Sequence, residues 1–243
     1  VKDERVEVLD LESDIVVYHP ADHRLLLCDS LQKKDRFETF PAFSPDGRTL
    51  YFCSAEAKKI PEEYKEIRYN LCSIDFDPSA GTFGSRIDTL VNAEALGKSV
   101  SFPRPSYDGK YIMFTLSDYG NFSIWHKEAN LWLLDLTSGD LRELSEVNSD
   151  DTESFHNWSS NSRWFVFSSR RGDGLYTRLY LASMDENGKI SKPFLLPQED
   201  PETYYDRSVY SYNVPDFVNA PILLDTKVFE LSLIHISEPT RPL

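Results

Sequence analysis

Residues 40–54 of this 243-residue chain are FPAFSPDGRTLYFCS, and a closely similar phrase returns as FPRPSYDGKYIMFTL at 102–116. A third version, FHNWSSNSRWFVFSS, begins at Phe155. Each copy joins a strand that contains aromatic residues or proline to a strongly β-prone run through a short polar turn. The recurrence of one hairpin along the chain is the observation that decides the fold.

The turns of the three copies specify their own geometry. Ser44-Pro45-Asp46-Gly47 and Ser106-Tyr107-Asp108-Gly109 end on glycine, which accepts the positive φ needed at the exit, and Pro45 presets φ for a type I turn. The third turn, Ser160-Asn161-Ser162, lacks glycine, so we expect Asn161 to adopt the left-handed conformation there. Each copy is therefore predicted to be a β-hairpin.

A second hairpin is predicted after each first one. Its leading strands are NLCSIDFD from Asn70, NLWLLDL from Asn130 and RLYLASM from Arg178, and a further copy, IVVYH, starts at Ile15. Each is followed by a polar turn and a shorter strand, at 86–90, 141–144, 192–195 and 24–27. Two hairpins in series give four antiparallel strands.

Four-stranded units that recur along a chain are typical of β-propeller blades, because stacking around an axis buries both faces of each sheet. We predict an all-β partial propeller, an arc from a larger ring, since a closed ring needs about four to eight blades. The predicted complete blades are 38–90, 99–144 and 152–196, with half a blade at 1–27 and a strand at 210–218.

Little helix is expected in the chain. The one predicted helix is Pro61–Ile67 (PEEYKEI), with Pro61 at its first position. The acidic run 198–202 contains proline and is interpreted as an exposed connection.

Composition excludes several classes of partner. Asp and Glu number 40 against 26 Lys and Arg, a formal charge of −14, which disfavours nucleic acid and anionic membranes. No apolar run is long enough to cross a bilayer as a helix. Cys28, Cys53 and Cys72 form no CxxC or CxxCH motif, so no cofactor or metal is predicted in this segment. The oligomeric state stays open.

The two ends of the sequence carry expectations of their own. VKDERVEVLDL at the start is neither an initiator methionine nor a signal peptide, so we expect an internal cut. The last residues, LSLIHISEPTRPL at 231–243, resemble the in-frame translation of a transposon-end sequencing adaptor. We therefore expect 231–243 to be a non-native tail and exclude it from fold reasoning.

The SPDG hairpin followed by an Asn-Leu-x-x-x-Asp strand resembles the repeat of TolB-type, WD40-like β-propellers over nearly all of residues 1–218. Four longer stretches resemble a family of uncharacterised envelope proteins of Gram-negative anaerobes: FPAFSPDGRTLYFCSA, SDYGNFSIWHKEANLW, NWSSNSRWFVFSSRR and KPFLLPQEDPE. That resemblance implies a periplasmic or outer-membrane-associated protein whose N-terminal region carries a cytochrome-c-like Cys-x-x-Cys-His motif. The motif is absent here, so any redox role belongs outside these residues.

One candidate ligand site is the loop SSRRGDGLYTR at 168–178. In an acidic protein its positive cluster is suited to a carboxylate or another anionic group. The alternative is an Arg–Asp network that only holds a long loop. The candidate residues are Arg170, Arg171, Asp173, Tyr176 and Arg178.

A second candidate is the matching loop one blade earlier, YGNFSIWH at 119–126. Its aromatic residues with a polar tip are suited to stacking a sugar or gripping a peptide, and the candidates are Tyr119, Trp125 and His126. The alternative is packing over the next blade. If the register is right, both loops lie on the same rim.

The remaining chemistry-bearing residues favour structural roles. His156 and Trp158 lie in a first strand, near the axis, and no histidine pair has metal-ligand spacing. No GxSxG nucleophile elbow occurs. No catalytic residue is predicted.

Three functions stay open from the sequence. The first is a non-enzymatic propeller that serves as a protein or ligand interaction scaffold in the cell envelope, accessory to a haem-bearing N-terminal segment. The second is a propeller that gates substrate for a peptidase or hydrolase domain outside these residues. The third is a propeller hydrolase or lyase with converging carboxylates or histidines in its central funnel, where the sequence offers only His156.

Overall fold

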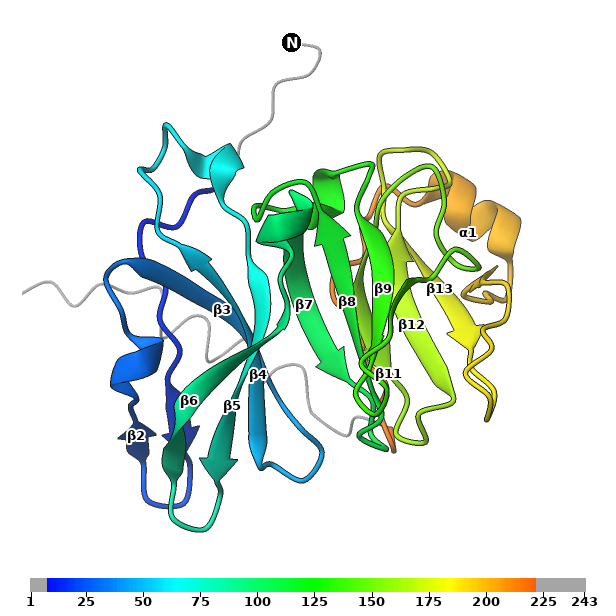
Figure 1. The fold of residues 1–243 in the computed structure, drawn as a ribbon. Coiled ribbons are helices and arrows are strands. Elements are labelled where there is room, and N and C mark those ends of the chain that lie inside the picture. Colours follow the sequence, from blue (N-terminus) through cyan, green and yellow to red (C-terminus); the bar gives the residue numbers. More distant parts are fainter. Residues whose placement is uncertain (1–7, 222–243) are drawn as a thin grey trace, which may run out of the picture.

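The structure, a computed structural model, describes residues 8–221 and consists mainly of antiparallel sheets that fan around one side of the molecule (Figure 1). Three sheets have four strands and a fourth has two. Within each four-stranded sheet the strands follow one another in chain order, so each sheet is two hairpins in series. The predicted all-β arc of propeller blades is confirmed.

Each of the three complete blades contains four strands. Blade 1 consists of β3 Arg36–Phe43, β4 Thr49–Glu56, β5 Asn70–Asp77 and β6 Thr82–Val91. Blade 2 consists of β7 Ser99–Pro105, β8 Tyr111–Ser117, β9 Asn130–Asp135 and β10 Leu141–Glu143. Blade 3 consists of β11 Glu153–Trp158, β12 Trp164–Ser169, β13 Arg178–Ser183 and β14 Phe194–Leu195.

The partial blade before them is the hairpin of β1 Val17–His19 and β2 Arg24–Leu26. One backbone hydrogen bond recurs at every junction between blades, and it shows which part of a blade the hairpin β1–β2 represents. In each case an amide early in a first strand donates to the carbonyl just before the preceding blade's third strand. The three bonds are Glu38 N to Ser13 O at 3.0 Å, Val100 N to Tyr69 O at 2.9 Å, and Glu153 N to Ala129 O at 2.8 Å. The hairpin β1–β2 therefore occupies the place of the third and fourth strands of a blade.

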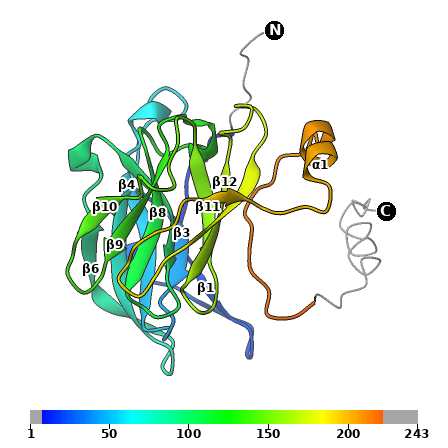
Figure 2. The same ribbon diagram turned by 90° about the vertical axis from the view of Figure 1, so that its right-hand side faces the viewer.

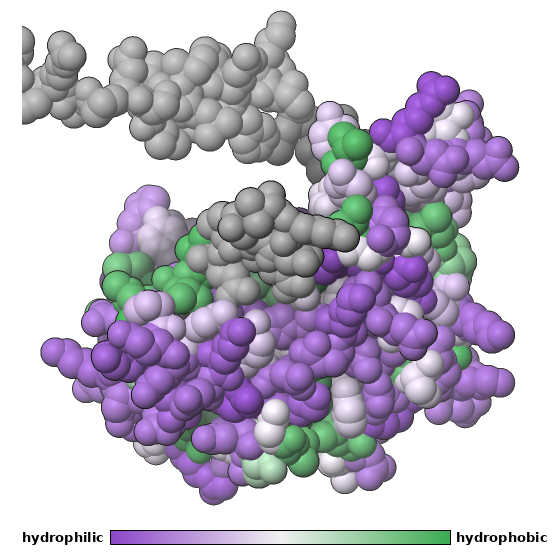
Figure 3. Space-filling view, turned by 90° about the horizontal axis from the view of Figure 1, so that it is seen from above, coloured by the Kyte–Doolittle hydropathy of each residue, from purple (hydrophilic) through white to green (hydrophobic). Residues whose placement is uncertain are grey.

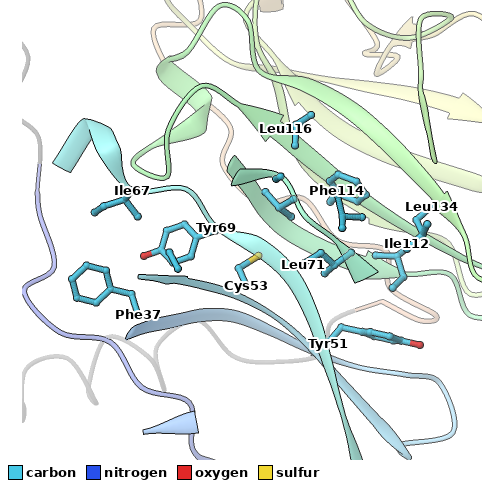
Figure 4. Close-up of a cluster of buried hydrophobic side chains, with 14 residues drawn as sticks. Phe37, Tyr51, Cys53, Ile67, Tyr69, Leu71, Ile112, Phe114, Leu116 and Leu134 are labelled. Carbon is cyan, nitrogen blue, oxygen red and sulfur yellow. The ribbon is translucent and has the colours of Figure 1, made fainter. Parts of the chain in front are cut away.

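Apolar side chains between neighbouring blades form the core. Leu71 of blade 1 and Phe114 of blade 2 are fully buried in the cluster shown in Figure 4, and Phe165 of blade 3 is fully buried in the next cluster. Burying a large apolar side chain contributes roughly 1.5–3 kcal/mol, so the interfaces between blades supply much of the stability. Cys53 and Cys72 are buried, free thiols on neighbouring strands, where Cys53 pairs with Leu71 and not with Cys72.

The turns reproduce one hydrogen-bond pattern, with one correction. Ser44 Oγ and Asp46 Oδ1 each accept a backbone amide in the first turn, and Gly47 has φ of 69°. In the third turn Asn161 takes the place of Asp46, accepting the amide of Arg163, and Ser162 has φ of 56°. The prediction that Asn161 is the left-handed residue was wrong, because its side chain holds the turn and the exit position falls on the next residue.

The predicted helix at Pro61–Ile67 is also wrong. The structure has turns there and only a short 3-10 helix, η2 Tyr64–Glu66, without a side-chain cap. A seven-residue α-helix instead forms at α1 Pro201–Arg207, and it begins within the predicted exposed connection 198–202. Both segments begin with proline, but only this one has a capping side chain: Asp200 accepts the amide of Thr203, which is the start signal that 61–67 lacks. The helix remains exposed, as the connection was expected to be.

The predicted strand at 210–218 does not form. Among the described residues this segment has no regular secondary structure, and it lies against blade 3 (orange in Figure 2). Its carbonyls accept hydrogen bonds from side chains of β11 and β12 and not from the backbone amides of a neighbouring strand. Asn213 O accepts from Ser168 Oγ at 2.6 Å, and Pro215 O accepts from Asn157 Nδ2 at 2.8 Å. Pro215 also lacks the amide that a ladder needs. The predicted non-native tail, 231–243, lies outside the described residues.

Candidate functional site

The first strands of the three blades converge, and each contains a phenylalanine in the same unusual conformation. Phe40, Phe102 and Phe155 have φ of 51°, 53° and 52°. Each lies where the pairing of the first and second strands shifts register, which marks a β-bulge. A bulky side chain at positive φ is rare, and strained backbone of this kind concentrates at functional sites.

The bulges bring the three rings together. The ring centroids of Phe40 and Phe102 are 4.3 Å apart with planes inclined by 46°, and those of Phe102 and Phe155 are 4.9 Å apart with planes inclined by 79°. Phe102 is therefore the centre of an aromatic row that crosses all three blades, which we call the phenylalanine row. The rings are half-buried and not enclosed in the core.

A pocket of about 340 Å³ opens over the phenylalanine row. Its remaining lining comes from Tyr69 at the start of β5, from Thr39 and Ser101 beside the row, and from the segment 117–123 that begins the long connection of blade 2. Val8 and Asp10 complete it from the N-terminal side. The pocket has the composition of a small-ligand site, namely an apolar floor with a few polar groups.

The long connection of blade 2 approaches the pocket lining closely, because its backbone packs directly against the ring of Tyr69. A Cβ atom at Gly120 would lie 2.4 Å from the ring of Tyr69, so only glycine permits the approach. The Gly120 amide also donates to Ile67 O at 3.0 Å. Phe122, which has φ of 44°, then precedes the 3-10 helix η4 Ser123–Trp125.

Buried hydroxyls tie η4 to blades 2 and 3. Ser101 Oγ donates to Ser123 Oγ at 3.1 Å, and Ser123 Oγ lies 3.1 Å from Ser154 Oγ. Thr115 Oγ1 donates to Ser154 Oγ, also at 3.1 Å. These hydrogen bonds fix the wall of the pocket, because a buried hydroxyl that loses its partner costs about 1–3 kcal/mol.

The structure places the predicted arginine cluster mostly in structural contacts. Arg171 Nη2 donates to Glu153 Oε1 at 2.8 Å and to Val147 O at 2.5 Å, and its guanidinium lies 4.5 Å from the centre of the Tyr180 ring. Burial raises the pKa of Glu153, and Arg171 opposes that rise. The charge of Arg171 is thus directed inward to a buried carboxylate.

Arg178 is likewise engaged by the chain that follows blade 3. Its guanidinium donates to Tyr210 O at 2.8 Å and to Ser208 O at 3.1 Å, and it lies 3.7 Å from Asp173. Asp173 Oδ1 accepts the amides of two residues after it, one of them Tyr176, at 2.8 Å, which shapes the loop tip. These contacts agree with the loop-holding alternative, while ligand binding by the loop stays a prediction.

The two predicted loops do meet. The guanidinium of Arg170 lies 4.5 Å from the centre of the Trp125 ring, a cation–π contact between blades 3 and 2. Tyr119 and His126 pack with ring centroids 4.1 Å apart, and burial lowers the pKa of His126 although Glu128 lies 3.2 Å from its Nδ1. Trp125 remains 43% exposed, and ligand contact by these loop residues stays a prediction.

His156 is enclosed between blades 2 and 3. Its Nε2 donates to Met113 O at 2.9 Å, and burial lowers its pKa to about 3, so the ring is neutral at pH 7. Trp158 Nε1 donates to Arg104 O at 3.0 Å across the same interface. Both residues hold the blades together, as expected of structural side chains.

Sequence reasoning missed the phenylalanine row, although its signal stands in the opening phrase. Phe40, Phe102 and Phe155 begin the three repeated stretches, each followed by Pro or His. Aromatic residues are common in strands, so their presence in the first strand of each hairpin gives no hint of a left-handed residue there. Their repetition at one blade position was the usable clue.

Comparison with known proteins gives a fold and no family. No protein-family profile matches the chain, and no curated protein matches it. An oligogalacturonate lyase in complex with manganese superposes with a TM-score of 0.53 and 12% sequence identity, over 76% of this chain and 49% of that one. The chain has a β-propeller fold.

Two other solved structures match more loosely. TolB from Acinetobacter baumannii has a TM-score of 0.38 and 19% identity, over 64% of this chain and 31% of that one. The propeller domain of the Trilobed protease from Pyrococcus furiosus has a TM-score of 0.39 and 16% identity, over 68% of this chain and 44% of that one. The chain thus spans less than half the length of each of these proteins.

Two further findings concern the described residues. Between Val8 and residue 221, no helix is long and apolar enough to cross a membrane. In the same range, no group of three or more His, Cys, Asp or Glu side chains is placed to hold a metal ion.

Proposed function

We propose that this chain is the recognition part of a propeller protein of the cell envelope, and that it binds a protein or ligand at the pocket over the phenylalanine row. The observation that carries the proposal is the row itself. Three blades each hold a bulky residue in a costly left-handed conformation, and the three rings converge on one pocket. A hydrophobic core has no need of such backbone.

The surroundings of the row support binding and not chemistry. The pocket walls are fixed by buried hydroxyl contacts, Phe122 is an exposed residue of its lining, and Trp125 is exposed at the other end of η4. Rigid pockets with exposed aromatic residues are typical of recognition surfaces, because ordering costs little on binding. The periplasmic or outer-membrane location, and the association with a haem-bearing segment, rest on the resemblance of four longer stretches of the sequence to envelope proteins.

Peptide display tests the proposal directly. Peptides are selected on the immobilised chain and their affinities are measured for wild type, Phe102→Ala and Phe43→Ala. Phe43 is the matched control, an exposed phenylalanine at the far end of β3. We expect Phe102→Ala to weaken binding about tenfold or more, since losing a buried aromatic anchor costs at least about 1.4 kcal/mol, while Phe43→Ala leaves it unchanged.

Two outcomes contradict the proposal. Selected peptides that bind Phe102→Ala as tightly as wild type place recognition elsewhere on the surface. A hydrolase domain encoded in the same gene, with peptides cleaved by the whole protein, assigns the propeller the substrate-gating role instead.

A further inference from the structure

The pocket over the phenylalanine row also has a definite electrostatic character. Among the described residues that line it, Asp10 is the one that carries a charge, and the lining contains no Lys, Arg or His. Asp10 lies close enough to Tyr69 to contribute, after burial and Cys53, to the raised pKa of that phenol. The described surface seen from above is mainly hydrophilic with a few hydrophobic patches (Figure 3), and the chain as a whole has a formal charge of −14. The one charged side chain among these lining residues therefore disfavours an anion.

Two serine hydroxyl groups of the pocket lining already donate hydrogen bonds within the protein. Ser117 Oγ donates to Tyr119 O at 3.0 Å, and Ser101 Oγ donates to Ser123 Oγ at 3.1 Å. A serine hydroxyl has one proton and two lone pairs, so the capacity left to Ser101 and Ser117 is that of acceptors. These groups therefore favour a ligand that donates hydrogen bonds.

The aromatic groups point to the same class of ligand. The rings of the phenylalanine row are inclined to one another by 46° and 79°, so the wall they form is not flat. Such a wall packs against an alkyl chain, and ring faces attract a cation within about 6 Å. A carboxylate gains nothing from the negative face of an aromatic ring.

From these three observations we propose that the pocket binds a primary alkylammonium group, such as a lysine side chain or a free aliphatic amine. The inference rests on the proposed function and names the ligand class for the same pocket. The alkyl chain lies against the phenylalanine row, and the ammonium group donates to the serine oxygens within the field of Asp10. Trp125 and Phe122 at the rim contact the rest of the molecule that carries the amine.

Three probes of equal length separate charge from hydrophobicity: hexylammonium, hexan-1-ol and hexanoate. Dissociation constants for the 243-residue chain are measured by NMR titration at pH 7 in low salt. We expect hexylammonium to bind about tenfold more tightly than hexan-1-ol, because a cation–π contact and a nearby carboxylate together contribute about 1–2 kcal/mol. Hexanoate should bind most weakly, and added salt should weaken hexylammonium alone.

Two pairs of variants locate the effect. Asp10→Asn should weaken hexylammonium about threefold and leave hexan-1-ol unchanged, as expected for an exposed carboxylate. Its control, Asp150→Asn, changes the same charge at an exposed site outside the pocket lining. Phe102→Leu should weaken hexylammonium about fivefold, and its control, Phe43→Leu, should not. Circular dichroism verifies that each variant folds.

The outcomes separate this inference from the proposed function. Equal affinity for hexylammonium and hexan-1-ol, or tighter binding of hexanoate, overturns the ammonium assignment while leaving a binding pocket. Failure of all three probes to bind at 50 mM, an assay limit of roughly −2 kcal/mol, also overturns it. In that case the peptide selection with Phe102→Ala decides independently whether the pocket recognises anything.

Discussion

Blades 1 and 3 carry a glutamate at the same point of their first strands, and the two side chains have different surroundings. Glu153 accepts from Ser149 Oγ at 2.6 Å, from Ser169 Oγ at 2.8 Å and from Arg171 at 2.8 Å. Glu38 is 1% exposed, accepts from one serine at 3.3 Å, and its Oε1 lies 3.9 Å from Arg36 Nε, while its Oε2 has no hydrogen-bond partner among the described residues.

Burial raises the pKa of both carboxyls, because removal from water disfavours the charged form of each. Blade 2 places Val100 at this position, with the same backbone hydrogen bond to the preceding blade. The repeat therefore specifies the backbone geometry of the first strand, while the side-chain contacts at this position differ from one blade interface to the next. Substitutions at equivalent positions of different blades should therefore change the free energy of unfolding by different amounts.

The largest difference is expected between Glu153→Val and Glu38→Val. Glu153→Val removes the partner of Arg171, whose side chain is 19% exposed, and should lower the free energy of unfolding by about 3–5 kcal/mol. Glu38→Val copies Val100 of blade 2 and removes a poorly paired buried carboxyl, so it should be neutral or stabilising by up to about 1 kcal/mol. Urea unfolding at pH 7 measures both. Equal losses would show that the two glutamates are equivalent after all.

The second difference concerns the residue after each phenylalanine of the row, which is Pro41, Pro103 or His156. The folded pKa of His156, about 3, lies below the ordinary value of 6.5. Between these values the unfolded chain binds a proton that the folded chain does not. The contribution of His156 is thus fully present above pH 6.5 and is lost as the pH falls, at up to about 1.4 kcal/mol per pH unit.

His156→Gln keeps a donor for Met113 O and removes the titration. Between pH 6.5 and 5, wild type should lose about 2 kcal/mol more than the variant, measured as the difference in urea midpoints at the two values. The prolines of blades 1 and 2 do not titrate, so no comparable slope is expected from their positions. A variant with the wild-type pH slope would assign the acid sensitivity to other groups.

The third comparison is between glycine-to-alanine substitutions in the long connections of blades 2 and 3. Gly120→Ala places a methyl group 2.4 Å from the buried Tyr69 ring and should cost about 1–3 kcal/mol as the loop shifts. Gly172→Ala is the matched change in blade 3, where a Cβ meets nothing within 4 Å, and should cost almost nothing. Thermal unfolding compares them. Gly120→Ala should also weaken ligand binding at the pocket, because residue 120 lines it. Wild-type stability and binding in Gly120→Ala would mean that the loop packs differently.

Much of the fold was readable because turn chemistry and strand patterning are local. SPDG and the strand after it predict a hairpin wherever they occur, and three copies predict an arc of blades. The segment 210–218 failed because its apolar residues resemble a strand, whereas its place is set by side-chain donors of blade 3 such as Ser168 and Asn157. Contacts of that kind depend on distant parts of the chain and leave no local pattern.

The candidate site was less readable for the same reason. The arginines of the loop at 168–178 were visible as a positive cluster, but the partners of Arg171 and Arg178 lie far along the sequence or in backbone carbonyls. The pocket depends on the positive φ of Phe102 and on the close packing of Gly120 against Tyr69. A strand pattern in the sequence predicts neither feature. Comparing the repeats position by position recovers the phenylalanines.

The smallest expected effect tests the corrected third turn. Ser162 takes the left-handed position that glycine fills in the other two turns, and its Oγ accepts the amide of Asp108 at 2.9 Å. Ser162→Gly should relieve about 1 kcal/mol of backbone strain and lose a hydrogen bond of similar size, for a net change within about 0.5 kcal/mol. Asn161→Gly should instead cost about 1 kcal/mol or more, because Asn161 accepts from Ser159 Oγ and the Arg163 amide. The opposite order of the two variants in urea unfolding would restore Asn161 as the left-handed residue.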